Sequence, residues 1–119
     1  MRKNFAFDYD SDNDSLFLYN PKYKSKASIE LDDIVIDFNS KKQLSAIEIT
    51  NATKMLANLL EEKKALSKTM LKSIKSCKIE IIKKNNALVV RLFIMLKSKQ
   101  IFTPLIIPTI TEPSPSIAG

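Results

Sequence analysis

Apolar and polar residues alternate in short runs along the first fifty residues, and polar turn sequences separate the runs. These runs are 4–9, 15–19, 29–31, 34–38 and 44–49. Period-two alternation is typical of strands that bury one face. The pattern predicts antiparallel hairpins that are connected by the turns at 10–14 and 39–42.

A four-residue turn at 39–42 fixes a register for the hairpin around it. It places Ile34 opposite Ile47 and Asp33 opposite Glu48, so that the isoleucines share the buried face. Asp33, Asp37 and Glu48 are then expected together on one face of the sheet. Paired carboxylates of this kind bind metal ions or take part in acid/base chemistry. The alternative is a solvated face that nearby lysines neutralise.

The periodicity becomes helical from Ala52 to about Ile74, with Asn51 as the expected N-cap. An apolar arc faces a stripe of lysines at Lys64, Lys68, Lys72 and Lys75. Lys63 falls inside the apolar arc, which indicates a break near residues 61–62. The lysine stripe could contact phosphates, although it is also the usual solvated side of an amphipathic helix.

Residues 78–83 and 87–97 form a second pair of predicted strands, with Asn85-Asn86 as a type I′ turn. This register pairs Glu80 with Arg91. Apolar side chains occupy both faces of the second strand, and one face carries Val89, Arg91, Phe93 and Met95. We therefore expect that face to be an interface, covered by a second subunit.

Residues 100–107 are apolar but are interrupted by Pro104, which predicts an edge strand or an extended arm. Residues 111–119 contain two Pro-Ser steps and are predicted to form a flexible tail. The expected fold class is α+β, with antiparallel hairpins in one or two sheets and a helical segment, about 51–75, packed on a face. Residues 1–110 are the expected single domain.

Composition removes several kinds of chemistry. The chain has no His, one Cys and one Gly, which is the last residue. Triads that need His, disulfides within the chain and Gly-rich phosphate loops are excluded on these grounds. No signal peptide or membrane span is evident, so a cytoplasmic protein is expected. Residues 61–119 hold 11 of the 19 basic and 4 of the 13 acidic side chains, which points to an anionic partner.

Three stretches carry a family resemblance. The segment Phe7-Asp-Tyr-Asp-Ser-Asp-Asn-Asp-Ser-Leu-Phe-Leu is similar to the "YD…D.LYI" opening of the domain of unknown function 2283 family. Ile34-Val-Ile-Asp-Phe-Asn resembles its "VILDYD" strand, and Leu44-Ser-Ala-Ile-Glu-Ile-Thr-Asn-Ala-Thr resembles its "vvGIEIlnAS" segment. The resemblance covers residues 5–53. The later part of the chain resembles the longer archaeal-type branch of that family.

The resemblance implies a small α+β domain without an established activity, so no catalytic residues are transferred to this chain. It also implies a regulatory or antitoxin-like role, as is suspected for similar small proteins. The sequence departs from the family where glycines are expected. Ser40 or Lys41 stands in the turn and Ala46 stands before Ile-Glu-Ile.

Two further groups of residues could carry chemistry. Asp8, Asp10, Asp12 and Asp14 alternate like the start of a calcium loop, but the Gly and Glu that an EF-hand requires are missing in both registers. A hairpin turn with Asx-type hydrogen bonds is the favoured interpretation. Cys77 lies between Lys75 and Lys78, which would lower the pKa of a reactive thiol. The alternative is a small buried residue.

Three functions follow from these patterns. The first is a non-enzymatic protein-interaction or regulatory module that forms a homodimer and needs no cofactor or metal. The second is a non-specific nucleic-acid binder that uses the lysine stripe. The third is a metal-assisted enzyme built on Asp and Glu alone. We favour the first, because the chain lacks the groups on which most catalytic sites depend.

Overall fold

The alternating runs of the first half form five strands, as the sequence predicts. The strands are β1 (Lys3–Asp10), β2 (Ser15–Tyr19), β3 (Ala27–Leu31), β4 (Ile34–Phe38) and β5 (Leu44–Ile49). The structure is a computed structural model. It describes residues 2–59, 66–84, 87–97 and 100–108, and of residues 84, 87 and 101–108 it describes the backbone alone.

Three longer strands form the second half: β6 (Ser76–Lys84), β7 (Ala87–Met95) and β8 (Gln100–Pro108). The predicted register between β6 and β7 is confirmed, because Glu80 lies opposite Arg91 and Ile81 lies opposite Val90. Strand β8 is the expected edge strand, paired with β7 on one side only. The predicted turn at 85–86 and the predicted tail at 111–119 lie outside the described residues.

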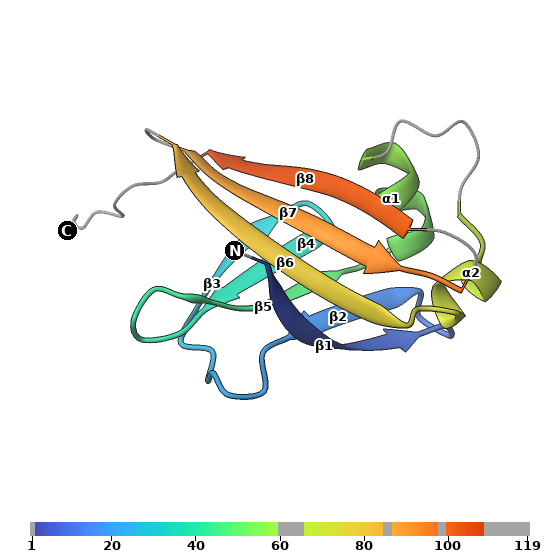
Figure 1. Ribbon diagram of the computed structural model, residues 1–119, viewed down its shortest axis with the longest axis horizontal. Helices are drawn as coiled ribbons and strands as arrows, with labels where there is room; N and C mark the ends of the chain where they lie inside the picture. The colour runs from blue at the N-terminus through green and yellow to red at the C-terminus, as the bar shows by residue number, and fades with distance from the viewer. Residues whose placement is uncertain (1, 60–65, 85–86, 98–99, 109–119) are drawn as a thin grey trace.

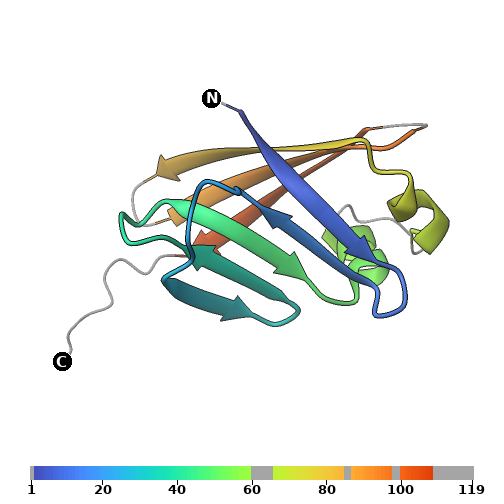
Figure 2. The same ribbon diagram turned by 90° about the horizontal axis from the view of Figure 1, so that it is seen from below.

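All eight strands belong to one antiparallel sheet with the order β3-β4-β5-β2-β1-β6-β7-β8. Strand β1 connects the two halves, since residues 3–5 pair with β6 and residues 6–10 pair with β2. The sheet curls at this strand, so that β6–β8 lie across β2–β5 (Figures 1 and 2). The result is an open half-barrel whose concave side faces the interior.

Two short helices lie at one end of the half-barrel (Figure 1). They are α1 (Ala52–Leu59) and α2 (Lys68–Lys72), and the side chain of Ser67 caps α2 by accepting a hydrogen bond from the Met70 amide. The expected helical segment from 51 to 75 is therefore too long. Leu66, Ser67 and residues 73–75 are not helical, while 60–65 lie outside the described residues. The fold is dominated by the sheet more strongly than the predicted α+β class implies.

The core lies between the two halves of the sheet and the helices. Strands β2, β4 and β5 contribute one wall, strands β6 and β7 contribute the facing wall, and α1 and α2 close one end. The largest fully buried side chains are Leu16, Leu18, Ile36, Ile47, Ile49, Leu56, Leu71, Ile79, Leu92, Ile94 and Leu96. Burial of this continuous apolar surface is the main force that holds the two halves together.

The predicted register of the β4–β5 hairpin is wrong by two residues. Ile34 lies opposite Ile49, and Ile47 lies opposite Ile36. The turn between the strands has five residues instead of four, and Ser45 is an extra residue at a bulge, because Asp37 pairs with Ala46 and Phe38 with Leu44. The four isoleucines still share the buried face, since a shift of two residues preserves the alternation.

Candidate functional site

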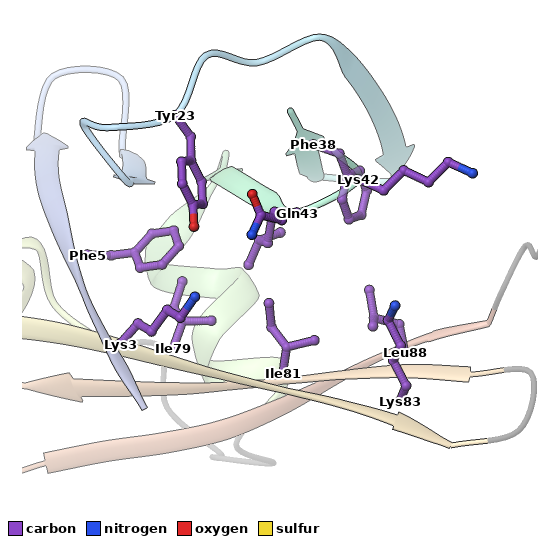
Figure 3. Close-up of a pocket in the computed structure, with 11 residues that line it drawn as sticks. Lys3, Phe5, Tyr23, Phe38, Lys42, Gln43, Ile79, Ile81, Lys83 and Leu88 are labelled. Atoms are coloured by element: carbon purple, nitrogen blue, oxygen red, sulfur yellow. The ribbon is translucent and has the colours of Figure 1, made fainter. Parts of the chain in front are cut away.

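A cleft with a volume of about 370 Å³ opens on the concave side of the half-barrel, and the residues that line it come from the end away from the helices. Both halves of the sheet and the loops between strands line it (Figure 3). The lining residues are Lys3, Phe5, Tyr23, Phe38, Lys42, Gln43, Leu44, Ile79, Ile81, Lys83 and Leu88. Its volume falls in the lower part of the ~300–1,000 Å³ range of small-molecule sites.

The floor of the cleft is apolar and continues into the core. Phe5, Leu44 and Ile79 are buried beneath it. Ile81 is 38% exposed, a high value for an isoleucine on the concave side of a sheet. The helices lie at the far end of the half-barrel, and the described side chains leave Ile81 only partly covered.

Two lysines bring positive charge into the cleft. Lys3 has the same side-chain direction as Phe5, and Lys83 has that of Ile79 and Ile81, because alternate residues of a strand point to the same face. In Figure 3 both side chains extend toward the cleft from the β1 and β6 walls. Within the described part of the chain, neither ammonium group forms an ion pair or a hydrogen bond.

The opposite wall supplies two neutral polar groups. The Tyr23 side chain reaches down from the β2–β3 connection with its hydroxyl toward Phe5 (Figure 3). That hydroxyl has no hydrogen-bond partner among the described residues. The amide of Gln43 lies beside it, and its carbonyl oxygen accepts a hydrogen bond from Asn39 at 3.0 Å.

The turn between β4 and β5 positions this wall. The Asn39 side-chain oxygen accepts hydrogen bonds from the backbone amides of Lys41 and Gln43, each at 2.9 Å. Lys42 takes a left-handed conformation with φ of 63°. Its side chain runs outward along the rim of the cleft and not into it (Figure 3).

The outer face of β7 carries the four residues that were predicted to form an interface. Arg91 forms an ion pair with Glu80 at 3.2 Å, as the register predicts. Phe93 is only 8% exposed, and the guanidinium carbon of Arg2 lies 3.7 Å from its ring centre, a cation–π contact. Met95 is 40% exposed and Val89 is partly exposed. The chain itself thus covers part of this face.

The predicted lysine stripe is not assembled on one continuous helix. Lys64 lies outside the described residues, and Lys68, Lys72 and Lys75 are exposed on and just after the five-residue helix α2. Lys68 lies close enough to the β1–β2 turn to contribute to lowering the pKa of Asp10 and of Asp14. Its charge is therefore partly balanced by the acidic turn.

The alternating aspartates form a hairpin turn, as the favoured interpretation predicts. The carboxylate of Asp10 accepts hydrogen bonds from the Asp12 and Asn13 amides and from the Asn13 side chain. In the described part of the chain, no cluster of three or more acidic, His or Cys residues could hold a metal ion. The hydrogen bonds of Asp10 account for the turn without a cation.

Asp14 has a structural role that the sequence analysis missed. Its carboxylate accepts a hydrogen bond from the backbone amide of Thr53 at 3.2 Å, and others from the Thr53 and Tyr9 hydroxyls at 2.7 and 2.6 Å. It thus provides the N-terminal cap of α1 across 39 residues. The prediction that Asn51 caps the helix is wrong, because its side-chain amide donates a hydrogen bond to Asp33 instead. Burial acts to raise the pKa of Asp14, yet these hydrogen bonds together lower it.

Of the three carboxylates that were expected on one face of the sheet, Asp37 and Glu48 do share a face with Val35, but each of the three has its own hydrogen-bond partner. Asp33 accepts hydrogen bonds from Thr50, while Asp37 accepts one from Ser28 at 2.6 Å. Glu48 lies opposite Val35 and accepts a hydrogen bond from Ser15 at 3.3 Å. The register shift moves Glu48 from its predicted place opposite Asp33 to a place opposite Val35, and the described residues contain no group of three such side chains that could hold a metal ion.

Cys77 follows the alternative interpretation, a small buried residue. It is 1% exposed on the inner face of β6, and burial raises its pKa to about 12. The proposal of a thiol activated by Lys75 and Lys78 is therefore wrong, since a buried, protonated thiol is a poor nucleophile.

Lys3 and Lys83 were not predicted to belong to a site, although the sequence contains a signal that their side chains point inward. Lys3 and Lys83 have the same parity as the buried residues of their own strands, Phe5 in one and Ile79 in the other. A lysine in phase with the core at the end of a strand marks a charge that points inward. Tyr23 gives no such signal, because it lies in an irregular loop.

The family comparison matches the first half of the chain. Residues 6–52 match the model of a family described as a protein of unknown function (DUF2283). An uncharacterised protein of Methanocaldococcus jannaschii is 48% identical over 48 residues, which cover 40% of this chain and 41% of that relative, so less than half of its length is matched. No solved structure matches the chain.

A second relative matches both halves. It is a protein of Methanosarcina mazei named a putative hypoxanthine phosphoribosyltransferase, and it is 33% identical over 95 residues. The match covers 78% of this chain and 71% of that protein. It therefore includes most of the strands that line the cleft.

Among the described residues, no helix has the length and the apolar character needed to cross a membrane.

Proposed function

Because this chain belongs to the DUF2283 family of proteins of unknown function, we propose its role from its own surfaces. The proposed function is that of a non-enzymatic protein-interaction or regulatory module. It self-associates through the outer face of β6 and β7, which is defined here by Val89, Arg91, Phe93 and Met95. In an antitoxin-like or other regulatory role of this chain, a protein partner would bind the same face.

The observation that supports this proposal is the apolar character of the outer face of a strand in the middle of β6–β8. Val89 and Met95 remain partly exposed there, on either side of the Arg91–Glu80 ion pair. Apolar side chains around a paired charge are typical of interface centres, where Met and Arg are enriched. The ion pair fixes the orientation of Arg91, which reduces the entropy lost on binding.

We do not extend the name of the Methanosarcina mazei relative to this chain. Transfer of a phosphoribosyl group requires a site that holds several phosphate oxygens, and proteins commonly build such sites from Gly-rich loops at helix N-termini. The only Gly of this chain is Gly119. A binding function therefore agrees better with its composition.

Nucleic-acid binding through the exposed Lys68, Lys72 and Lys75 is the alternative. It is weakened by the short α2 helix and by the acidic turn beside Lys68. If it is correct, binding to duplex DNA or RNA will be measurable at low salt and will fall steeply as salt is raised.

The test of self-association uses two exposed apolar residues on the outer surface of the sheet. Met95 is 40% exposed on the proposed interface, and Phe17 is 37% exposed on the other half, where it stacks on Tyr19. We expect the wild-type chain to be a dimer by multi-angle light scattering and Met95→Lys to be a monomer, because a lysine there would have to be desolvated.

Phe17→Lys is the matched control and is expected to remain dimeric. Thermal unfolding of both variants checks that the fold is retained. A wild-type chain that is monomeric at every concentration tested would contradict self-association. A dimer that persists in Met95→Lys would show that the interface lies elsewhere.

A further inference from the structure

We propose that the cleft at the open end of the half-barrel binds a small amphipathic anion. Such a ligand has a compact apolar body and one carboxylate or phosphate head group. The site lies on the concave side of the sheet, opposite the outer face of β6 and β7. The inference is therefore independent of the self-association proposed above.

The apolar body is indicated by the floor of the cleft. Ile81 is 38% exposed and Leu88 is partly exposed, and both lie above the buried Phe5 and Ile79. Water contacts this apolar surface in the absence of a ligand, so that covering it is favourable by roughly 25 cal/mol per Å². A volume of about 370 Å³ admits a small molecule and excludes a folded partner.

The anionic head is indicated by charge. Eleven residues line the cleft, and three of them are lysines while none is Asp or Glu. Lys3 and Lys83 extend toward the cavity from neighbouring strands and have no anionic partner in the described part of the chain. Lys3 lies opposite Ile79, four residues along β6 from Lys83, so the anionic head would form an ion pair with one ammonium group and lie in the positive field of the other.

Orientation is provided by the opposite wall. The Tyr23 hydroxyl points into the cleft without a partner among the described residues, and the amide of Gln43 lies next to it. A hydroxyl and an amide N–H both donate hydrogen bonds to carboxylate or phosphate oxygens. Together with the lysines they form a polar rim around an apolar floor, which is the usual composition of a small-molecule site.

The experiment separates head group from body with four probes. Decanoate and decyl phosphate carry both parts, decanol carries the body alone, and acetate carries the head alone. We expect decanoate or decyl phosphate to bind by isothermal titration calorimetry below its critical micelle concentration. Decanol is expected to bind at least fivefold more weakly, and acetate not measurably. The preferred member of the first pair identifies the head group.

Variants then locate the site. Lys3→Met and Lys83→Met keep the alkyl stem but remove the charge. Each is expected to weaken binding by about fivefold, which is the upper end of the contribution of a solvent-exposed ion pair. Lys54→Met is the matched control, since Lys54 is exposed on α1 and does not line the cleft. Ile81→Trp is expected to fill the cleft and abolish binding. Because Ile81 is partly exposed, this variant should keep its fold, which its melting temperature checks.

Any of five outcomes would overturn the proposal. Three concern the probes: the absence of binding by both amphipathic anions, equal affinity for decanol and decanoate, and equal affinity for acetate and decanoate. The fourth is unchanged affinity in the variant that combines Lys3→Met with Lys83→Met. Loss of binding in Lys54→Met to the same degree would also do so, because it would indicate general attraction to a basic protein. None of these results depends on whether the chain is a monomer or a dimer.

Discussion

The two halves of the molecule are held together in different ways. In the first half, residues 6–52, side-chain hydrogen bonds fix the turns, as Asp10, Asp14 and Asn39 illustrate. The second half, β6–β8, depends on long strands, of which β6 and β7 have a buried inner face, together with the ion pair of Glu80 with Arg91. The half that matches the family model is thus the one in which specific polar residues define the turns.

This difference follows from the near absence of glycine. Among the described residues, four have a positive φ, and all lie within the first half: Asp14, Asp32, Lys42 and Asn51. Left-handed conformations disfavour residues with a Cβ, although Asp and Asn tolerate them through local hydrogen bonds. The first half therefore replaces the freedom of glycine with side-chain contacts.

The largest loss of stability is expected from a core substitution in the apolar second half. Leu92 is fully buried on the inner face of β7. Leu92→Ala would leave a cavity and lower the free energy of unfolding by about 2–5 kcal/mol. Urea denaturation measures this loss. A decrease below about 1 kcal/mol would show that the two halves do not share one packed core.

A smaller effect is expected from the polar first half. Asp14→Ala removes the cap of α1 and the acceptor of the Tyr9 hydroxyl. It is expected to lower the free energy of unfolding by about 1–2 kcal/mol, the range for a lost N-cap. Asp12→Ala in the same turn is the control, and it should change stability by less than about 0.5 kcal/mol because Asp12 is exposed.

The effect of Asp14 should also depend on pH. Its pKa in the folded chain is lowered below the ordinary value of about 3.9, so that the unfolded chain binds the proton more readily. The stabilisation that the ionised Asp14 carboxylate provides is fully present above the ordinary pKa, and it is lost as the pH falls through the lower pKa of the folded chain. The difference in melting temperature between wild type and Asp14→Ala should therefore shrink below about pH 4. A difference that stays constant down to pH 2 would argue against an ionised cap.

The smallest expected effect is a gain in the free energy of unfolding. Asp32 has φ of 54° in the two-residue turn between β3 and β4. Asp32→Gly should raise the free energy of unfolding by about 0.5 kcal/mol, because glycine adopts this conformation without strain. Asp33→Gly is the control and should be destabilising, since Asp33 accepts a hydrogen bond from Thr50. A loss of stability in Asp32→Gly would mean that the aspartate stabilises the turn by more than its strain.

The strands could be predicted from the sequence, but their registers could be predicted only where the turn was simple. The β6–β7 pairing followed from a two-residue turn and the match of Glu80 with Arg91. The β4–β5 pairing failed because the bulge at Ser45 leaves no mark in the apolar alternation. A shift of two residues keeps the isoleucines buried, so that hydrophobicity alone cannot distinguish the two registers.

The cleft could not be predicted, because its parts are distant in sequence. Lys3, Tyr23 and Lys83 come together only after the sheet curls at β1 and the helices fill the other end. The predicted interface residues were easier to identify, since all four lie on one strand. What the sequence did not reveal is that Arg2, near the start of the chain, covers Phe93.

Strand β1 has a further consequence, because it forms hydrogen bonds with both halves along its length. Neither half can lose its order without breaking backbone hydrogen bonds of the same eight-residue segment. Heating should therefore melt the whole sheet in one cooperative step, and backbone amides on β2 and β6 should exchange with deuterium through the same global opening.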